Sequence, residues 1–208
     1  MRKNARIEKV SSKTSKKRMS YLETSSFKLW LWRLPWLIIL MLSATFTGLI
    51  ISKNEKILSN GIYGILLTSC IPLIMGTGGN AGGQASVTII RSIALNEISF
   101  KDLFKVVYKE FKVGVLLGLF LGVICFGKIL LIDGLLFQIQ GVNISSSLVI
   151  SLAMVITIII SKFIGCSLPM LAKKCGLDPA VIASPLITTI IDILSLVIYC
   201  KFVVAFLL

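Results

Sequence analysis

The chain has 208 residues, of which 56% are hydrophobic and only 15% carry a charged side chain, and its formal net charge is +13. A soluble globular domain of this length has much more polar surface, so the composition excludes that class and predicts an all-α integral membrane protein. The positive charge is concentrated at one end, because ten of the 22 Lys and Arg residues lie within the first 33 positions.

The first 28 residues are basic and polar, and they show no sustained apolar period. Such a segment cannot bury enough apolar surface to fold alone, so we expect a disordered cytoplasmic tail over residues 1–28 that touches anionic membrane lipid. Basic stretches beside membrane spans mostly set topology, and we therefore expect no nucleic-acid partner. A cleavable signal peptide fits poorly, because the apolar run begins late and no small-residue cleavage site follows it.

Five apolar runs follow the tail, and each is long enough to cross a bilayer, since a hydrocarbon core of about 30 Å needs about 20 helical residues. Five spans place the two termini on opposite sides. Eighteen of the 22 basic residues then fall on the N-terminal side, which predicts a multi-pass cell-membrane protein with its N-terminus in the cytoplasm and its C-terminus outside. The predicted spans cover residues 30–51, 61–94, 106–132, 148–171 and 181–208.

The second span contains PLIMGTGGNAGGQAS, residues 72–86, in which five glycines surround Asn80 and Gln84. Pro72 and the glycines are expected to loosen the helical hydrogen bonds, and non-helical backbone inside a membrane is tolerated only where protein or water covers it. The freed carbonyl groups and the two amides would then line a cavity on an ion path. The alternative is a tight helix crossing at the glycines, which leaves the two amides unexplained.

The third span carries Gly114, Gly118 and Gly122 at intervals of four, so that they share one helix face. Small residues in this pattern favour close packing against another helix. Glu110 lies just before this face and beside Lys109. It is either a solvated charge at the membrane boundary or a functional carboxylate.

The fifth span places a carboxylate, Asp192, in an otherwise apolar run. An ionised side chain near the bilayer centre costs about 2.5 kcal/mol or more, so Asp192 is expected to face the bundle interior or a wet cavity. An ion pathway is the favoured interpretation, and a neutral, hydrogen-bonded carboxyl is the alternative. Polar residues at intervals of four, four, three and four predict one polar face that holds Ser184, Thr188, Asp192, Ser195 and Tyr199.

The available chemistry is that of oxygen ligands. The chain has no histidine, and its five cysteines show no paired metal spacing, so a zinc or copper site is not expected. Nucleophilic catalysis lacks its usual base, and we expect no enzyme. Carboxylate, amide, hydroxyl and carbonyl oxygens instead suit hard cations such as Mg²⁺, Ca²⁺ or Mn²⁺.

Four stretches resemble the MgtE family of magnesium channels and transporters. PLIMGTGGNAGGQASVTIIRSIALNEI is similar to the second membrane helix of that family, with its Gly-Asn-x-Gly-x-Gln core. RLPWLIILMLSATFTGLII resembles the first helix, and GLDPAVIASPLITTIIDILSLVIYC resembles the fifth, with the Asp-Pro-Ala turn and the intramembrane aspartate in place. YKEFKVGVLLGL is similar to the start of the third, with Lys109 for the usual Arg. The resemblance covers about residues 33–206.

The resemblance implies a homodimer in which residues 29–208 of each protomer form a five-helix transmembrane ion-transport domain. It also implies an ion path at the two-fold axis, between the second and fifth helices of both copies, that carries hydrated Mg²⁺ into the cytoplasm. Oxygen ligands alone also admit Mn²⁺ and Co²⁺. The residues that the resemblance assigns to the metal path are Asp192, Asn80, Gly79, Thr188, Ala180, Asp178 and Gln84.

The chain departs from the typical family pattern in front of the first span. Typical members carry a large cytosolic region with paired CBS domains that senses magnesium, whereas only a short basic tail precedes the spans here. We therefore expect no regulation by an attached magnesium sensor. The rival hypothesis is a non-transporting membrane scaffold or assembly factor, in which the glycine-rich helix only packs and Asp192 is a buried hydrogen-bonding partner.

Overall fold

A computed structural model of the chain describes residues 21–59 and 61–207, without the side chains of residues 21 and 180–185. Residues 1–20 of the predicted basic tail lie outside the described residues. The chain divides into two compact units, Met1–Ile39 and Leu40–Leu208. The predicted domain boundary at residue 28 stays a prediction.

The described part of the first unit holds η1 (Tyr21–Glu23) and the beginning of α2 (Ser26–Lys53). Aromatic and basic side chains meet at the start of α2. The rings of Phe27 and Trp30 stack with centroids 5.4 Å apart, and Nζ of Lys28 lies 5.2 Å from the ring centroid of Trp32. Tryptophan and lysine gather at membrane–water interfaces, so this segment has the composition of an interfacial anchor.

The second unit contains the end of α2 and the remaining helices, which short turns connect. These elements are α3 (Glu55–Leu58), η2 (Gly61–Tyr63), α4 (Gly64–Ala94), η3 (Phe100–Asp102), α5 (Leu103–Lys128), the π-helix η4 (Ile129–Leu136), α6 (Ile144–Lys174) and α7 (Pro179–Phe206).

The predicted all-α class and the five predicted spans are confirmed. Five helical segments of the described chain are long and apolar enough to cross a membrane. Their lengths follow from the apolar runs in the sequence, since about 20 helical residues cover the hydrocarbon core. The segments are Ser26–Lys53, Gly61–Ala94, Phe100–Leu136, Ile144–Lys174 and Leu186–Phe206.

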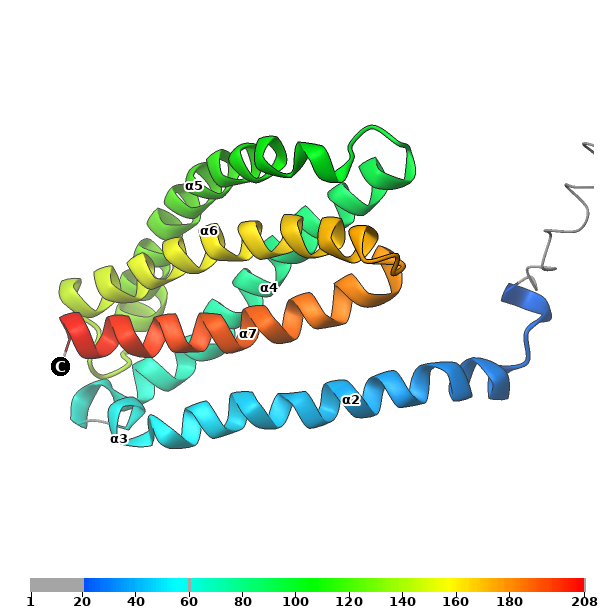
Figure 1. Cartoon of the computed structure of the whole chain (residues 1–208). Coiled ribbons are helices and arrows are strands. Elements are labelled where there is room, and N and C mark those ends of the chain that lie inside the picture. Colours follow the sequence, from blue (N-terminus) through cyan, green and yellow to red (C-terminus); the bar gives the residue numbers. More distant parts are fainter. Residues whose placement is uncertain (1–20, 60, 208) are drawn as a thin grey trace, which may run out of the picture. The chain divides into compact units, whose positions relative to one another are not determined.

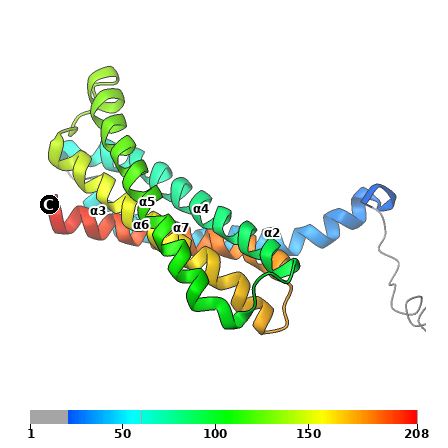
Figure 2. The ribbon, with the colours of Figure 1, turned by 90° about the horizontal axis from the view of Figure 1, so that it is seen from above.

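Helix α6 occupies the centre of the second unit, because it contacts α4, α5 and α7, while α4 also contacts α7 (Figure 1). The view from above shows the same four helices packed along one another (Figure 2). A central helix needs apolar or small side chains on several faces, and α6 accordingly contributes many of the buried residues. The contact of α4 with α6 and α7 is the part of this arrangement that positions the candidate site.

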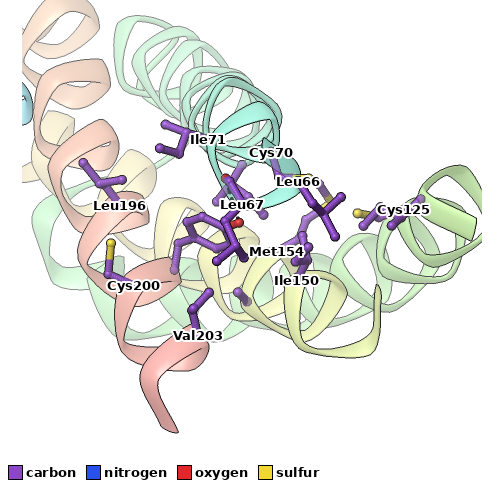
Figure 3. Packing of buried hydrophobic residues seen from close by; sticks show 14 of the residues in the cluster. Leu66, Leu67, Cys70, Ile71, Cys125, Ile150, Met154, Leu196, Cys200 and Val203 are labelled. Carbon is purple, nitrogen blue, oxygen red and sulfur yellow. Dashed lines mark hydrogen bonds between the residues drawn. The ribbon is translucent and has the colours of Figure 1, made fainter. Parts of the chain in front are cut away.

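The main apolar core joins α4, α6 and α7, with Cys125 of α5 at its edge (Figure 3). Leu66, Met154 and Leu196 are almost completely buried in it. The core also holds the fully buried Tyr199, whose hydroxyl group donates a hydrogen bond of 2.9 Å to the carbonyl oxygen of Leu67. One polar bond therefore ties α7 to α4 inside an apolar environment.

The expected loosening of the glycine-rich stretch is wrong, because α4 runs as an uninterrupted α-helix through Pro72 and all five glycines. Pro72 removes one hydrogen bond from the ladder and crowds the carbonyl group four residues before it, yet the helix continues on both sides. The weak helix preference of glycine is a local term that tertiary packing overrides. The carbonyl groups of this stretch therefore remain engaged in the helix, and the alternative of a tight helix crossing describes Gly78 and Gly82.

Candidate ion-binding site

Asp192 of α7 lies directly against Gly79 of α4. A Cβ atom built on Gly79 would be 3.7 Å from Oδ1 of Asp192, and the Asp192 side chain is only half-buried. Because Gly79 has no side chain, the carboxylate faces the α4 backbone at this point. The structure thus brings together two of the residues that the sequence assigned to one site.

The neighbouring glycines allow α4 to approach α6 and α7 closely. A Cβ on Gly78 would lie 2.7 Å from Cγ2 of Thr157 in α6 and 2.8 Å from Oγ of Ser195 in α7. A Cβ on Gly82 would overlap Cδ1 of Ile191. Real Cβ atoms essentially never make such close contacts, so a side chain at either position requires the facing side chains of α6 or α7 to shift.

A row of exposed positions at intervals of four residues winds along α4, and we call it the α4 polar strip. Its members share small or polar side chains, and Oγ1 of Thr88 donates a hydrogen bond of 2.9 Å to the carbonyl oxygen of Gln84. Lipid is a poor neighbour for amides and hydroxyls within a membrane span, so the strip requires water or protein beside it. The α4 polar strip consists of Thr68, Pro72, Gly76, Asn80, Gln84 and Thr88.

The predicted polar face of α7 is divided between two environments. Ser195 and Tyr199 are buried against α4, Asp192 is half-buried, and Thr188 is exposed. The side chain of Ser184 lies outside the described residues. Each interval of four residues turns the row by about 40°, but the interval of three from Asp192 to Ser195 turns it back, so all these positions stay on one face of α7. Their burial therefore differs along the helix axis: the C-terminal part of the face packs on α4, and Thr188 lies beyond that contact.

Asp178 and Ala180 lie at the N-terminal end of α7, whereas the main core contacts its C-terminal half. Asp178 is exposed immediately before the helix, and Ala180 belongs to its first turn, with a side chain outside the described part of the chain. Twelve residues of α-helix, about 18 Å, separate Ala180 from Asp192. Within one chain the structure does not bring these residues to Asp192, and their assignment to the metal path stays a prediction.

The oxygen donors that the sequence assigns to the metal path are few. Among the described residues, no group of three or more His, Cys, Asp or Glu side chains could hold a metal ion. Asp192, Asn80 and Gln84 instead offer one carboxylate and two amides. Mg²⁺ usually keeps several of its waters and binds through one or two carboxylates, so a donor set of this kind fits an ion held through its hydration shell.

Two ion pairs with a buried carboxylate were not found from the sequence. Nζ of Lys162 lies 3.8 Å from Oε2 of Glu110, and Nζ of Lys128 lies 2.6 Å from Oδ2 of Asp133. The eighteen basic residues predicted on the cytoplasmic side include Lys162. In the structure Lys162 belongs to α6, and its side chain is buried in the bundle and only 5% exposed. The sequence does contain one indication of this pair, a lysine within an apolar run. An ionisable residue inside a membrane span needs a partner of opposite charge.

Comparison with known proteins gives a consistent set of relatives. Residues 71–202 match the MgtE family, described as "Divalent cation transporter". The chain is 35% identical over 181 residues to the "Magnesium transporter MgtE" of Thermus thermophilus, an alignment that covers 86% of this chain and 37% of that protein.

Two further relatives carry the same name. The protein of Bacillus subtilis is 33% identical over 174 residues, which are 84% of this chain and 36% of the relative. The protein of Enterococcus faecalis is 34% identical over 167 residues, which are 80% of this chain and 34% of the relative. The chain thus spans about a third of the length of the curated relatives that it matches.

Proposed function

This chain belongs to the MgtE family, and we propose that it carries Mg²⁺ across a membrane along the α4 polar strip and past Asp192. The observation that carries the proposal is the placement of an intramembrane carboxylate against Gly79, where α4 and α7 meet. A carboxylate at this depth is costly unless it serves a wet cavity or a partner. The names of three relatives support magnesium as the ion.

The ion would travel with its inner waters. Because α4 continues as an α-helix through the glycines, the carbonyl groups around them accept helical hydrogen bonds, whereas that of Thr68 has no helical donor because Pro72 lacks an N–H. The remaining donors are side chains, namely the carboxylate of Asp192, the amides of Asn80 and Gln84, and nearby hydroxyl groups. Mg²⁺ dehydrates reluctantly, so these groups would hold its water shell rather than replace it. Mn²⁺ and Co²⁺ remain candidate substrates for the same oxygen ligands.

A second copy of the chain completes the proposed path. The α4 polar strip is exposed in one chain, and two copies related by a two-fold axis would cover it while enclosing water between their α4 and α7 helices. The axis would bring two Asp192 carboxylates toward each other. Two like charges at close range repel unless a divalent cation or protons lie between them, which supports a cation site on the axis. The N-terminus would face the cytoplasm, and transport would run inward.

Reconstituted vesicles test this proposal. Purified protein is inserted into vesicles that contain a magnesium-sensitive dye, an inward Mg²⁺ gradient is imposed, and uptake is compared with that of protein-free vesicles. We expect saturable uptake of Mg²⁺, with Mn²⁺ and Co²⁺ as competitors. Correctly inserted, folded protein that gives no divalent uptake would contradict the proposal and favour the scaffold hypothesis.

A further inference from the structure

Two ionised side chains are buried between α5 and α6. The Glu110 side chain is 13% exposed and the Lys162 side chain is 5% exposed, and both belong to helices that are long and apolar enough to cross a membrane. Oε2 of Glu110 has no hydrogen-bond partner among the described residues, and it lies 3.8 Å from Nζ of Lys162. The opposite charge of Lys162 is therefore what stabilises this carboxylate, and each charge alone would be uncompensated.

The pair lies at the end of the α5 face that carries Gly114 and Gly118 and packs on α6. A Cβ on Gly114 would lie 3.3 Å from Cα of Ile159, and one on Gly118 would lie 3.2 Å from the carbonyl oxygen of Val155. As the position on α5 rises by four, its contact on α6 falls by four. The two helices are thus antiparallel, and the Glu110–Lys162 pair lies one turn further along the same contact, where a Cβ on Gly114 would also lie 3.4 Å from Cβ of Lys162.

The neighbours of Lys162 on α6 hold α4 in place. A Cβ on Gly82 would lie 3.0 Å from the carbonyl oxygen of Ser161, and a Cβ on Gly165 would overlap the carbonyl oxygen of Gly82. Gly82 follows Gly79, which faces Asp192, by less than one helical turn. A rotation or slide of α6 therefore displaces the part of α4 that carries the candidate ion site.

We infer that Glu110 and Lys162 are positioning residues that fix α6 in its register, and through α6 fix α4 against Asp192. This inference rests on the proposed transport function. The ion contact of the pair joins α5 to α6, so its effect on α4 runs through the placement of α6. Loss of one charge drives the other toward water, moves α6 and weakens ion binding, whereas neutralising or exchanging both charges leaves no uncompensated charge.

The test compares two single variants, Glu110→Gln and Lys162→Met, with two double variants. The first double variant combines these changes, and the second exchanges the charges as Glu110→Lys with Lys162→Glu. We expect each single change to raise the half-saturating Mg²⁺ concentration for vesicle uptake about fivefold or more, as is typical of mutations that act through a coupled element. Both double variants are expected to return within about twofold of wild type.

A matched control removes the other ion pair through Lys128→Met with Asp133→Asn. That pair closes within α5 and η4, five residues apart, and does not join α5 to α6. Half-saturation in this variant is expected to match wild type. Single variants that keep wild-type half-saturation would overturn the inference, as would folded double variants that remain as impaired as the single ones.

Hydrogen–deuterium exchange of residues 78–84 provides a readout that does not depend on transport. Exchange there is expected to rise in both single variants and to return in both double variants. If the wild-type protein carries no ions, the proposed function fails while this measurement still decides on the pair. Should the single variants not fold, the charge-exchange variant decides: wild-type exchange and uptake support the inference, and impaired ones overturn it.

Discussion

Gly82 of α4 and Gly165 of α6 touch backbone to backbone, because a Cβ on Gly165 would lie 2.9 Å from Cα of Gly82 and would overlap its carbonyl oxygen. Contacts of this kind let two membrane helices gain dispersion energy without a hydrophobic driving force. The contact also fixes the height at which α4 crosses α6. The position of the candidate ion site therefore depends on the absence of side chains at two positions.

Gly82→Ala is expected to destabilise the protein by about 1–3 kcal/mol, the usual cost of overpacking a core. The added methyl group would overlap Cδ1 of Ile191 and lie 3.0 Å from a backbone oxygen of Ser161. Thermal unfolding in detergent micelles measures the effect. Gly127→Ala is the control, since no described atom lies within 4 Å of a Cβ at that position. Equal melting temperatures for the two variants would contradict the tight crossing.

Asp192→Asn is expected to reduce divalent uptake to the level of protein-free vesicles while the protein keeps its melting temperature. The substitution preserves the shape of the side chain and removes the charge that attracts a cation. Vesicle flux, normalised to folded and inserted protein, is the measurement. Wild-type flux through a well-folded Asp192→Asn or Asp192→Ala protein would remove Asp192 from the path.

Asn80→Leu is expected to block flux without loss of stability, because the position is exposed on the α4 polar strip. Val87→Leu is the matched control, an apolar exchange at a position of the same helix that is 67% exposed. Gly118→Ala should show the opposite behaviour, with weaker packing, because its Cβ would lie 3.2 Å from a backbone oxygen of Val155. Equal loss of folding in Asn80→Leu and Gly118→Ala would favour the scaffold hypothesis.

Lys128→Met is expected to destabilise the protein by about 3–5 kcal/mol, since it leaves the buried carboxylate of Asp133 without its partner. Both oxygens of Asp133 accept hydrogen bonds from Nζ of Lys128, at 2.8 and 2.6 Å. The double variant with Asp133→Asn should recover most of the lost stability. Thermal unfolding of the two variants side by side checks this, and additive losses would show that the pair does not act as a unit.

Tyr199→Phe is expected to lower stability by about 1 kcal/mol, the typical net contribution of one hydrogen bond, and to leave flux intact. The lost bond is the one between the buried hydroxyl group and the carbonyl oxygen of Leu67. Tyr63→Phe serves as the control, because that hydroxyl only accepts a 3.3 Å bond from Asn143 at an exposed position. A melting temperature that falls equally in both variants would contradict the assignment.

The spans could be predicted because bilayer thickness imposes a length on every apolar run. The close face of Gly114, Gly118 and Gly122 was equally readable, since intervals of four place residues on one side of a helix, and all three are buried against α6. Span length and residue spacing are both properties of a single helix, so the local sequence is sufficient to predict them.

The remaining features depend on which helix lies opposite. The stretch around Gly78 and Gly82 remains helical because α6 and α7 pack onto it, and no local pattern names those partners. Glu110 and Lys162 are 52 positions apart, so their pairing follows from the register of α5 on α6. For the same reason Asp192 could be recognised as a costly charge, whereas its contact with Gly79 became visible only in the packed bundle.

The glycine contacts of α4 have a consequence for biogenesis. Every partner that closes on Gly78 and Gly82 belongs to α6 or α7, which are synthesised after α4. Helix α4 is also the least apolar of the five spanning segments. During synthesis the segment with the weakest preference for lipid thus enters the membrane while both of its sides are still uncovered. For α4, insertion thus precedes tertiary packing, and its glycine contacts are complete only when α7 has been made.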